Sequence, residues 1–130
     1  MTRRACARAL VADDEELVRT LVARVVAEYA DTVEQAAGGE QALRALEASA
    51  FDLVVTDIRM PIVDGLAVVR WVHRHRPETK IVAITGYAGG DTEQEIAVLG
   101  AELLYKPFGA RELRQALERA LASPQTPDKR

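Results

Sequence analysis

The residues of this sequence that could do chemistry together are three aspartates, a threonine and a lysine: Asp13, Asp14, Asp57, Thr85 and Lys106. Carboxylates that crowd into one site raise each other's pKa unless a cation lies among them. Aspartate oxygens without Cys or His ligands favour a hard ion, and Mg²⁺ suits a few carboxylates together with water. With such a metal, one carboxylate could attack phosphorus while the lysine and the hydroxyl stabilise the phosphoryl oxygens. The residue types therefore point to phosphoryl transfer onto an aspartate.

This chemistry requires the five residues to meet, and the apolar pattern predicts that they do. Short runs suited to β-strands occur at 9–11, 53–55, 81–84 and 103–105, with a weaker one at 32–33. Stretches with helical spacing lie between them, and this alternation is typical of a parallel sheet covered on both faces. The carboxyl ends of parallel strands lie along one edge of the sheet, where ligands of such folds bind. Each of the five residues ends or follows a predicted strand, so we expect all of them at this edge.

Apolar stripes mark the five predicted helices. The first stripe is the widest, with Leu17, Leu21 and Val25 beside Val18, Val22 and Val26. The other four helices are marked by Ala42, Leu43 and Leu46, by Leu66, Val69 and Val72, by Ile96 and Leu99, and by Leu113, Leu117 and Leu121. Gly89 and Gly90 precede Thr92 and Glu95, a spacing that predicts a flexible loop running into a capped fourth helix. Gly100 is expected to end that helix.

Each candidate residue also has an ordinary structural interpretation. Asp13 and Glu16 have the spacing of a helix cap, and Asp57 lies among turn formers. Thr85 could be a plain strand residue, and Lys106 could be a solvated lysine in a loop. Their joint occurrence at strand ends favours the chemical interpretation.

The composition excludes several classes of protein. The chain has 130 residues, of which 48% are hydrophobic and 28% charged, with a net charge of −3. This is typical of one globular domain and gives no basic excess for direct binding of nucleic acid. The single cysteine, Cys6, offers neither an internal disulfide nor a zinc site, and we expect it to act as a small hydrophobe at the start of a strand. No apolar run has the length of a signal peptide or membrane span, so we expect a cytoplasmic protein without a membrane partner.

Four motifs follow one another in a fixed order: Asp13-Asp14; Asp57-Ile58-Arg59-Met60-Pro61-Ile62-Val63-Asp64-Gly65; Ile84-Thr85-Gly86; and Gly100-Ala101 ahead of Tyr105-Lys106-Pro107-Phe108. This combination resembles the receiver domain of two-component response regulators. The resemblance covers residues 5–122 and leaves 123–130, a polar stretch with two prolines, as a flexible tail or truncated linker. It implies an α/β fold of the (βα)₅ flavodoxin-like type, with a doubly wound parallel sheet in strand order 2-1-3-4-5.

The resemblance also implies the roles of the acidic residues. Asp57 would be the phosphoacceptor, and its donor would be a phosphohistidine on a sensor histidine kinase or a histidine phosphotransfer protein. Asp14 and Asp57 would bind Mg²⁺ directly, with the backbone carbonyl of Arg59 as a further ligand. Asp13 would act mainly through metal-bound water.

The remaining implied roles concern phosphoryl binding and signalling. Lys106 would pair with one phosphoryl oxygen, Thr85 would hydrogen-bond another, and the peptide bond between Lys106 and Pro107 would be cis. The domain would be a signalling switch, catalysing only its own phosphorylation and slow dephosphorylation. Its output surface would be the fourth helix, fifth strand and fifth helix. That surface would act on a separate partner, a covalently linked effector domain or a second copy of the phosphorylated chain.

The sequence departs from the usual family pattern at one position. Leu103 stands where the family usually has an aromatic residue whose rotamer reports the movement of the threonine. Tyr105 or Tyr87 could take over that role, or both could simply pack. Arg59 and Tyr87 flank the expected phosphoryl group, and their bulk predicts slow to moderate loss of phosphate.

Two other functions compete with the phosphoacceptor switch. A phosphatase of the haloacid dehalogenase type needs a second acid two residues after the nucleophile, and Arg59 occupies that place. A pseudo-receiver that signals by binding alone would normally lack part of the acidic pair, acceptor or lysine, and this sequence has them all. The basic run at 70–76, with its two histidines, is interpreted as a solvated helix face rather than a metal or nucleic-acid site.

Overall fold

The computed structural model describes residues 5–86 and 90–122 and contains a single five-stranded sheet. The strands are β1 (Cys6–Ala12), β2 (Ala30–Ala36), β3 (Leu53–Asp57), β4 (Lys80–Thr85) and β5 (Glu102–Tyr105). The helices are α1 (Glu16–Val26), α2 (Gly39–Ala48), α3 (Gly65–His75), α4 (Gly90–Val98) and α5 (Ala110–Ala122). All neighbouring strands pair in parallel, in the order β2-β1-β3-β4-β5. The predicted fold class and strand order are confirmed.

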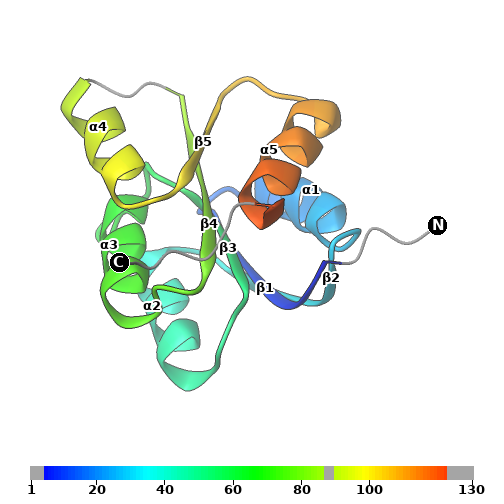
Figure 1. Ribbon diagram of the computed structural model, residues 1–130, viewed down its shortest axis with the longest axis horizontal. Coiled ribbons are helices and arrows are strands. Elements are labelled where there is room, and N and C mark those ends of the chain that lie inside the picture. The colour runs from blue at the N-terminus through cyan, green and yellow to red at the C-terminus, as the bar shows by residue number, and fades with distance from the viewer. Residues whose placement is uncertain (1–4, 87–89, 123–130) are drawn as a thin grey trace.

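Two layers of helices cover the two faces of the sheet. Helices α1 and α5 lie on one face, and α2, α3 and α4 lie on the other (Figure 1). Side chains alternate between these layers along each strand, so Val11 and Val55 face the first layer while Leu10 and Val54 face the second. All of β3 is buried, which explains why its sequence is a continuous apolar run rather than an alternating one.

The predicted stripe of α1 is wider than the face that the helix buries. Val22 and Val26 are buried against the sheet, and Val18 and Val25 pack beside them. Leu17 is 74% exposed and Leu21 52% exposed. The sequence pattern could not separate these positions, because every one of them is apolar and only the angle of the packed helix decides which are covered.

The start of α4 also differs from the prediction. The helix begins at Gly90, so Thr92 lies inside its first turn and does not cap it. Glu95 instead forms an ion pair with Arg70 of α3. Gly100 has a φ of +82°, the left-handed conformation expected of a glycine that follows a helix.

Some predictions concern segments that the structure does not describe. Residues 123–130, predicted to be a flexible tail or linker, lie outside the described residues, as do Tyr87 and Gly89. In the part of the chain that is described, no helix combines the length and apolar character needed to cross a membrane.

The connection from β3 to α3 brings two backbone segments into close approach at Gly65. A Cβ atom at this position would lie 2.0 Å from the carbonyl oxygen of Asp57 and 2.7 Å from the Cα of Ile58. The Gly65 N–H also donates a hydrogen bond to the Ile58 carbonyl at 2.7 Å. Only glycine therefore lets α3 begin directly against the end of β3.

We predict that Gly65→Ala lowers the free energy of unfolding by about 1–3 kcal/mol, because the added methyl group overlaps backbone that cannot move independently. The measurement is urea unfolding followed by circular dichroism. Gly38→Ala is the matched control, since a Cβ there meets nothing within 4 Å and the residue has an extended φ of −176°. Equal stability of the two variants would contradict the proposed close approach.

Candidate functional site

The strand register brings the predicted chemical residues to one edge of the sheet. Asp57 is the last residue of β3 and Thr85 the last of β4. Asp13 follows β1 directly, and Lys106 follows β5. The Lys106 N–H donates to the Thr85 carbonyl at 2.8 Å, which holds the ends of β4 and β5 together. The expected convergence at the carboxyl edge is present.

Three carboxylates form a tight cluster at this edge. One oxygen from each of Asp13, Asp14 and Asp57 lies within 4.8 Å of the others. Asp13 and Asp57 are almost completely buried, with 1% and 3% exposure, whereas Asp14 is exposed. The cluster is therefore closed by protein on one side and accessible from solvent through Asp14.

Protein groups satisfy only part of this cluster. Asp57 Oδ2 lies 3.3 Å from Lys106 Nζ, and Asp13 Oδ1 accepts a hydrogen bond from the Glu15 N–H at 2.9 Å. The other oxygen of each buried carboxylate, Asp13 Oδ2 and Asp57 Oδ1, is buried without a hydrogen-bond partner among the described residues. Buried acceptors of this kind require a donor or a cation.

The electrostatics of the cluster follow from its burial. Burial raises the pKa of Asp57, and the nearby Lys106 ammonium opposes the rise. Burial also raises the pKa of Asp13, against the hydrogen bond from the Glu15 backbone, and the Asp57 charge adds to the rise. The raised pKa of each carboxyl indicates that the protein's own groups compensate only part of its negative charge.

The donor set fits a hard divalent cation. It consists of carboxylate oxygens without sulfur or imidazole, and the two unpartnered oxygens are buried next to an exposed third carboxylate. Mg²⁺ is commonly bound by one or two carboxylates while it keeps several waters, and an open side toward solvent allows this.

The helix-cap interpretation of Asp13 is wrong. Helix α1 begins at Glu16, and Glu15 occupies the cap position without a side-chain hydrogen bond. The Asp13 carboxylate accepts from the Glu15 backbone but turns toward the acidic cluster, where its second oxygen has no partner among the described residues.

The other predicted site residues lie around the cluster. Thr85 is buried at the end of β4, and Arg59 is exposed in the loop that follows Asp57. The Lys106–Pro107 peptide bond is cis, the isomer that the family resemblance implies. Leu103 is partly buried against the core.

Tyr105, one of the two residues considered for the aromatic switch role in place of Leu103, is 45% exposed. The other, Tyr87, lies outside the described part of the chain.

Sequence reasoning missed one supporting residue. The guanidinium of Arg19 in α1 donates to the Asp13 carbonyl at 2.9 Å, and its Nε donates to Gln35 Oε1 at 3.0 Å. Arg19 thereby fixes the turn that carries the acidic pair. An arginine on an exposed helix face gives no sequence signal for such a contact, because its partner is a backbone oxygen.

Comparison with known proteins gives a consistent family assignment. The family model described as the response regulator receiver domain matches residues 9–118. The regulatory protein AtoC of Escherichia coli is 33% identical over 115 residues, which cover 88% of this chain and 25% of AtoC. The CAI-1 autoinducer sensor kinase/phosphatase CqsS of Vibrio cholerae is 35% identical over 92 residues, covering 71% of this chain and 13% of CqsS. The chain thus spans a quarter or less of the length of these relatives.

The solved structures agree with this result. The chemotaxis response regulator CheY4 of Vibrio cholerae superimposes with a TM-score of 0.75 at 31% identity, covering 88% of this chain and 98% of CheY4. A family match over most of the chain, together with the confirmed strand order, identifies this chain as a member of the response regulator receiver domain family.

Proposed function

We propose that the domain accepts a phosphoryl group on Asp57 and uses Mg²⁺ to do so. The observation that carries this proposal is the buried Asp57 carboxylate, which has Lys106 on one oxygen and no hydrogen-bond partner on the other among the described residues. Receiver domains of response regulators are signalling switches, so the reaction serves regulation rather than substrate turnover. The donor that we propose is a phosphohistidine on a sensor histidine kinase or a phosphotransfer protein.

The metal ligands that we propose are Asp14 and Asp57, with the backbone carbonyl of Arg59 and, through water, Asp13. The acidic cluster supports this choice because its charges need a cation and its oxygens are hard ligands. A bound Mg²⁺ would neutralise negative charge that builds up on the phosphoryl oxygens during transfer.

The transfer is a displacement at phosphorus. A carboxylate oxygen of Asp57 forms the new P–O bond, and the P–N bond to the donor imidazole breaks. The imidazole nitrogen leaves with the bonding pair, so no acid on this chain is required to protonate an oxygen leaving group. We propose that Lys106 pairs with a phosphoryl oxygen and that the Thr85 hydroxyl donates to another; the 3.3 Å distance from Lys106 Nζ to Asp57 Oδ2 supports the role of the lysine.

The output that we propose passes through α4, β5 and α5. The relatives with similar receiver sequences are a regulatory protein, a sensor kinase/phosphatase and a chemotaxis response regulator. The match covers 25% of AtoC, 13% of CqsS and 98% of CheY4, so these relatives differ in how much of their chain lies outside it. We therefore propose the phosphoacceptor reaction without assigning a particular effector.

The direct test is the intact mass of the protein after incubation with a small acyl-phosphate donor. We expect a gain of one phosphoryl group when Mg²⁺ is present, no gain when the metal is removed with EDTA, and no gain in Asp57→Asn. Asp57→Asn gains nothing because asparagine keeps the size of the side chain but lacks the nucleophilic carboxylate.

Asp64→Asn is the matched control, because Asp64 belongs to the same loop and caps α3 through its Oδ1, an oxygen that asparagine retains. It should gain the phosphoryl group as the wild type does. If the wild type gains nothing under any condition, the chain is a pseudo-receiver that signals by binding alone.

A second prediction concerns the metal-free protein and pH. A carboxyl group with a raised pKa in the folded state holds its proton more tightly when folded, so stability falls as pH rises from the ordinary carboxyl range through the folded-state pKa. Asp13 has such a raised pKa. Asp13→Asn, which keeps the oxygen that accepts from Glu15, should therefore raise the free energy of unfolding at pH 7 in EDTA by about 1 kcal/mol.

Urea unfolding at pH 7 and at about pH 4, near the ordinary carboxyl pKa, measures this effect. The gain should shrink at the lower pH, where the wild-type carboxyl also becomes protonated. Added Mg²⁺ should stabilise the wild type more than the variant. A variant less stable than the wild type at pH 7 without metal would show that the carboxylate charge is already well compensated.

A further inference from the structure

Helix α4 is held to the domain by fewer buried side chains than the helices around it. Among its described residues only Ile96 is buried. Neighbouring α3 buries four residues, and α5, on the other face of the sheet, also buries four. The position of α4 therefore depends more on its few other contacts than the position of α3 does.

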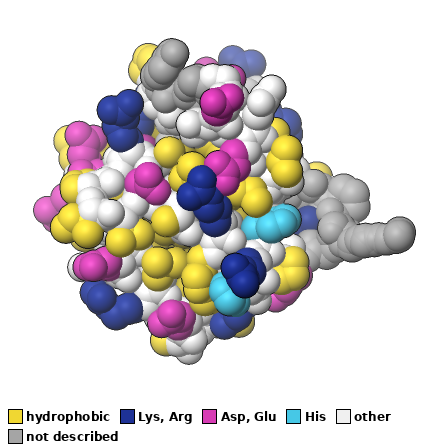
Figure 2. Space-filling model, turned by 90° about the vertical axis from the view of Figure 1, so that its left-hand side faces the viewer, with side chains coloured by type: hydrophobic (Ala, Val, Ile, Leu, Met, Phe, Trp, Pro, Cys, Tyr) yellow, Lys and Arg dark blue, Asp and Glu magenta, His cyan; other side chains and the backbone are white. Residues whose placement is uncertain are grey.

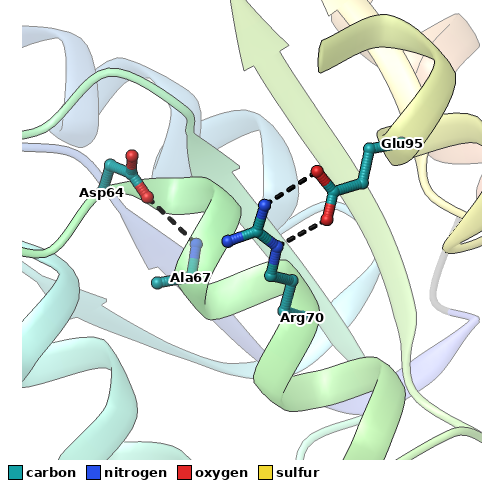
Figure 3. Close-up of polar contacts among 4 residues, drawn as sticks. All are labelled: Asp64, Ala67, Arg70 and Glu95. Carbon is teal, nitrogen blue, oxygen red and sulfur yellow. Dashed lines mark hydrogen bonds and ion pairs between the residues drawn. The ribbon is translucent and has the colours of Figure 1, made fainter. Parts of the chain in front are cut away.

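One of those contacts is a two-pronged ion pair between α3 and α4. The guanidinium of Arg70 reaches both carboxylate oxygens of Glu95, with Nη2 at 2.8 Å from Oε1 and Nε bonded to Oε2 (Figure 3). Parallel Arg–carboxylate bonds of this kind fix the relative direction of the two groups as well as their distance. The basic side chains on this face of the molecule are interspersed with acidic and hydrophobic ones (Figure 2). The guanidinium of Arg70 is therefore occupied by Glu95 of α4 and is not available to bind a ligand.

The α3 end of this contact is firmly anchored next to the site. Asp64 caps α3 by accepting from the Ala67 N–H at 3.0 Å, and Gly65 packs its backbone against that of Asp57. Arg70 lies further along the same helix, so it is positioned by the strand end that carries Asp57. Glu95 lies in the helix that follows β4, which ends at Thr85.

We propose that the Arg70–Glu95 ion pair tethers α4 in the arrangement of the unmodified domain and so sets how readily the domain switches. This inference rests on the proposed phosphorylation of Asp57. In this structure Lys106 pairs with the unphosphorylated Asp57 carboxylate. The ion pair between Arg70 and Glu95 therefore belongs to the unmodified arrangement. An interaction that is stronger in one of two arrangements of a protein raises the population of that arrangement, by an amount set by the difference in interaction free energy. Partly exposed pairs change such ratios by up to about fivefold, and salt weakens them.

The test compares Arg70→Gln and Glu95→Gln with the wild type. The readouts are the rate of phosphorylation by a small acyl-phosphate donor with Mg²⁺ and the hydrogen exchange of α4 amides in the unmodified protein. We expect both variants to be phosphorylated up to about fivefold faster and to exchange faster in α4. In 1 M salt, the wild-type rate should approach the rate of the variants.

Glu34→Gln is the matched control. Glu34 of β2 forms an ion pair with Arg8 of β1, and its side chain is 42% exposed against 35% for Glu95, but this pair joins two strands outside the proposed output surface. It should leave both the phosphorylation rate and the exchange of α4 unchanged.

Three results would overturn the tether: unchanged or slower phosphorylation in Arg70→Gln and Glu95→Gln, unchanged exchange in α4, or an equal acceleration in Glu34→Gln. A wild type that takes up no phosphoryl group would instead overturn the proposed function, and the switch with it. The exchange of α4 in the unmodified variants separates these cases, because it reports the tether without any phosphorylation.

Discussion

The crowding of negative charge at the end of β3 governs the chemistry of the site. Asp13 and Asp57 are both buried and share one site with Asp14, an arrangement that raises the pKa of both buried carboxyls. A single lysine at 3.3 Å compensates only part of this charge. Without a cation the arrangement is unfavourable for folding. A cation in the cluster would offset the repulsion among the carboxylates, and with it the repulsion that an incoming phosphoryl group would meet there.

The fold holds these charges together by means that have little to do with them. A parallel sheet brings all strand ends to one edge, and the two apolar layers around it bury side chains that stabilise the domain. Gly65 lets α3 start against the backbone of Asp57, so the proposed acceptor is packed closely by the start of this helix. The layers are unequal in one respect: among the described residues of α4 only Ile96 is buried, and an ion pair between Arg70 and Glu95 joins this helix to α3. Close packing around Asp57 and fewer buried contacts at α4 fit the proposed function, in which Asp57 stays fixed and the output surface changes on phosphorylation.

The sequence predicted the parts of this arrangement that follow from local pattern. The continuous apolar run of β3 predicted a strand buried on both faces, and residues at strand ends predicted the acidic edge, including Asp57 and Lys106. The exposure of Leu17 was not predictable, because an apolar residue on a helix gives no sign of whether a neighbour covers it. Glu95 was interpreted as part of a helix cap from its spacing to Thr92, whereas its partner, Arg70, lies 25 residues away. Contacts between distant side chains depend on the tertiary structure, which local spacing does not describe.

Chemical trapping would identify the residue that takes the phosphoryl group. Borohydride reduces an aspartyl phosphate to homoserine, and peptide mass spectrometry then locates the converted residue. After incubation with an acyl-phosphate donor and Mg²⁺, we expect homoserine at position 57, and aspartate there when the donor or the metal is omitted. Homoserine at Asp13 or Asp14, or conversion at 57 that does not require the metal, would contradict this expectation.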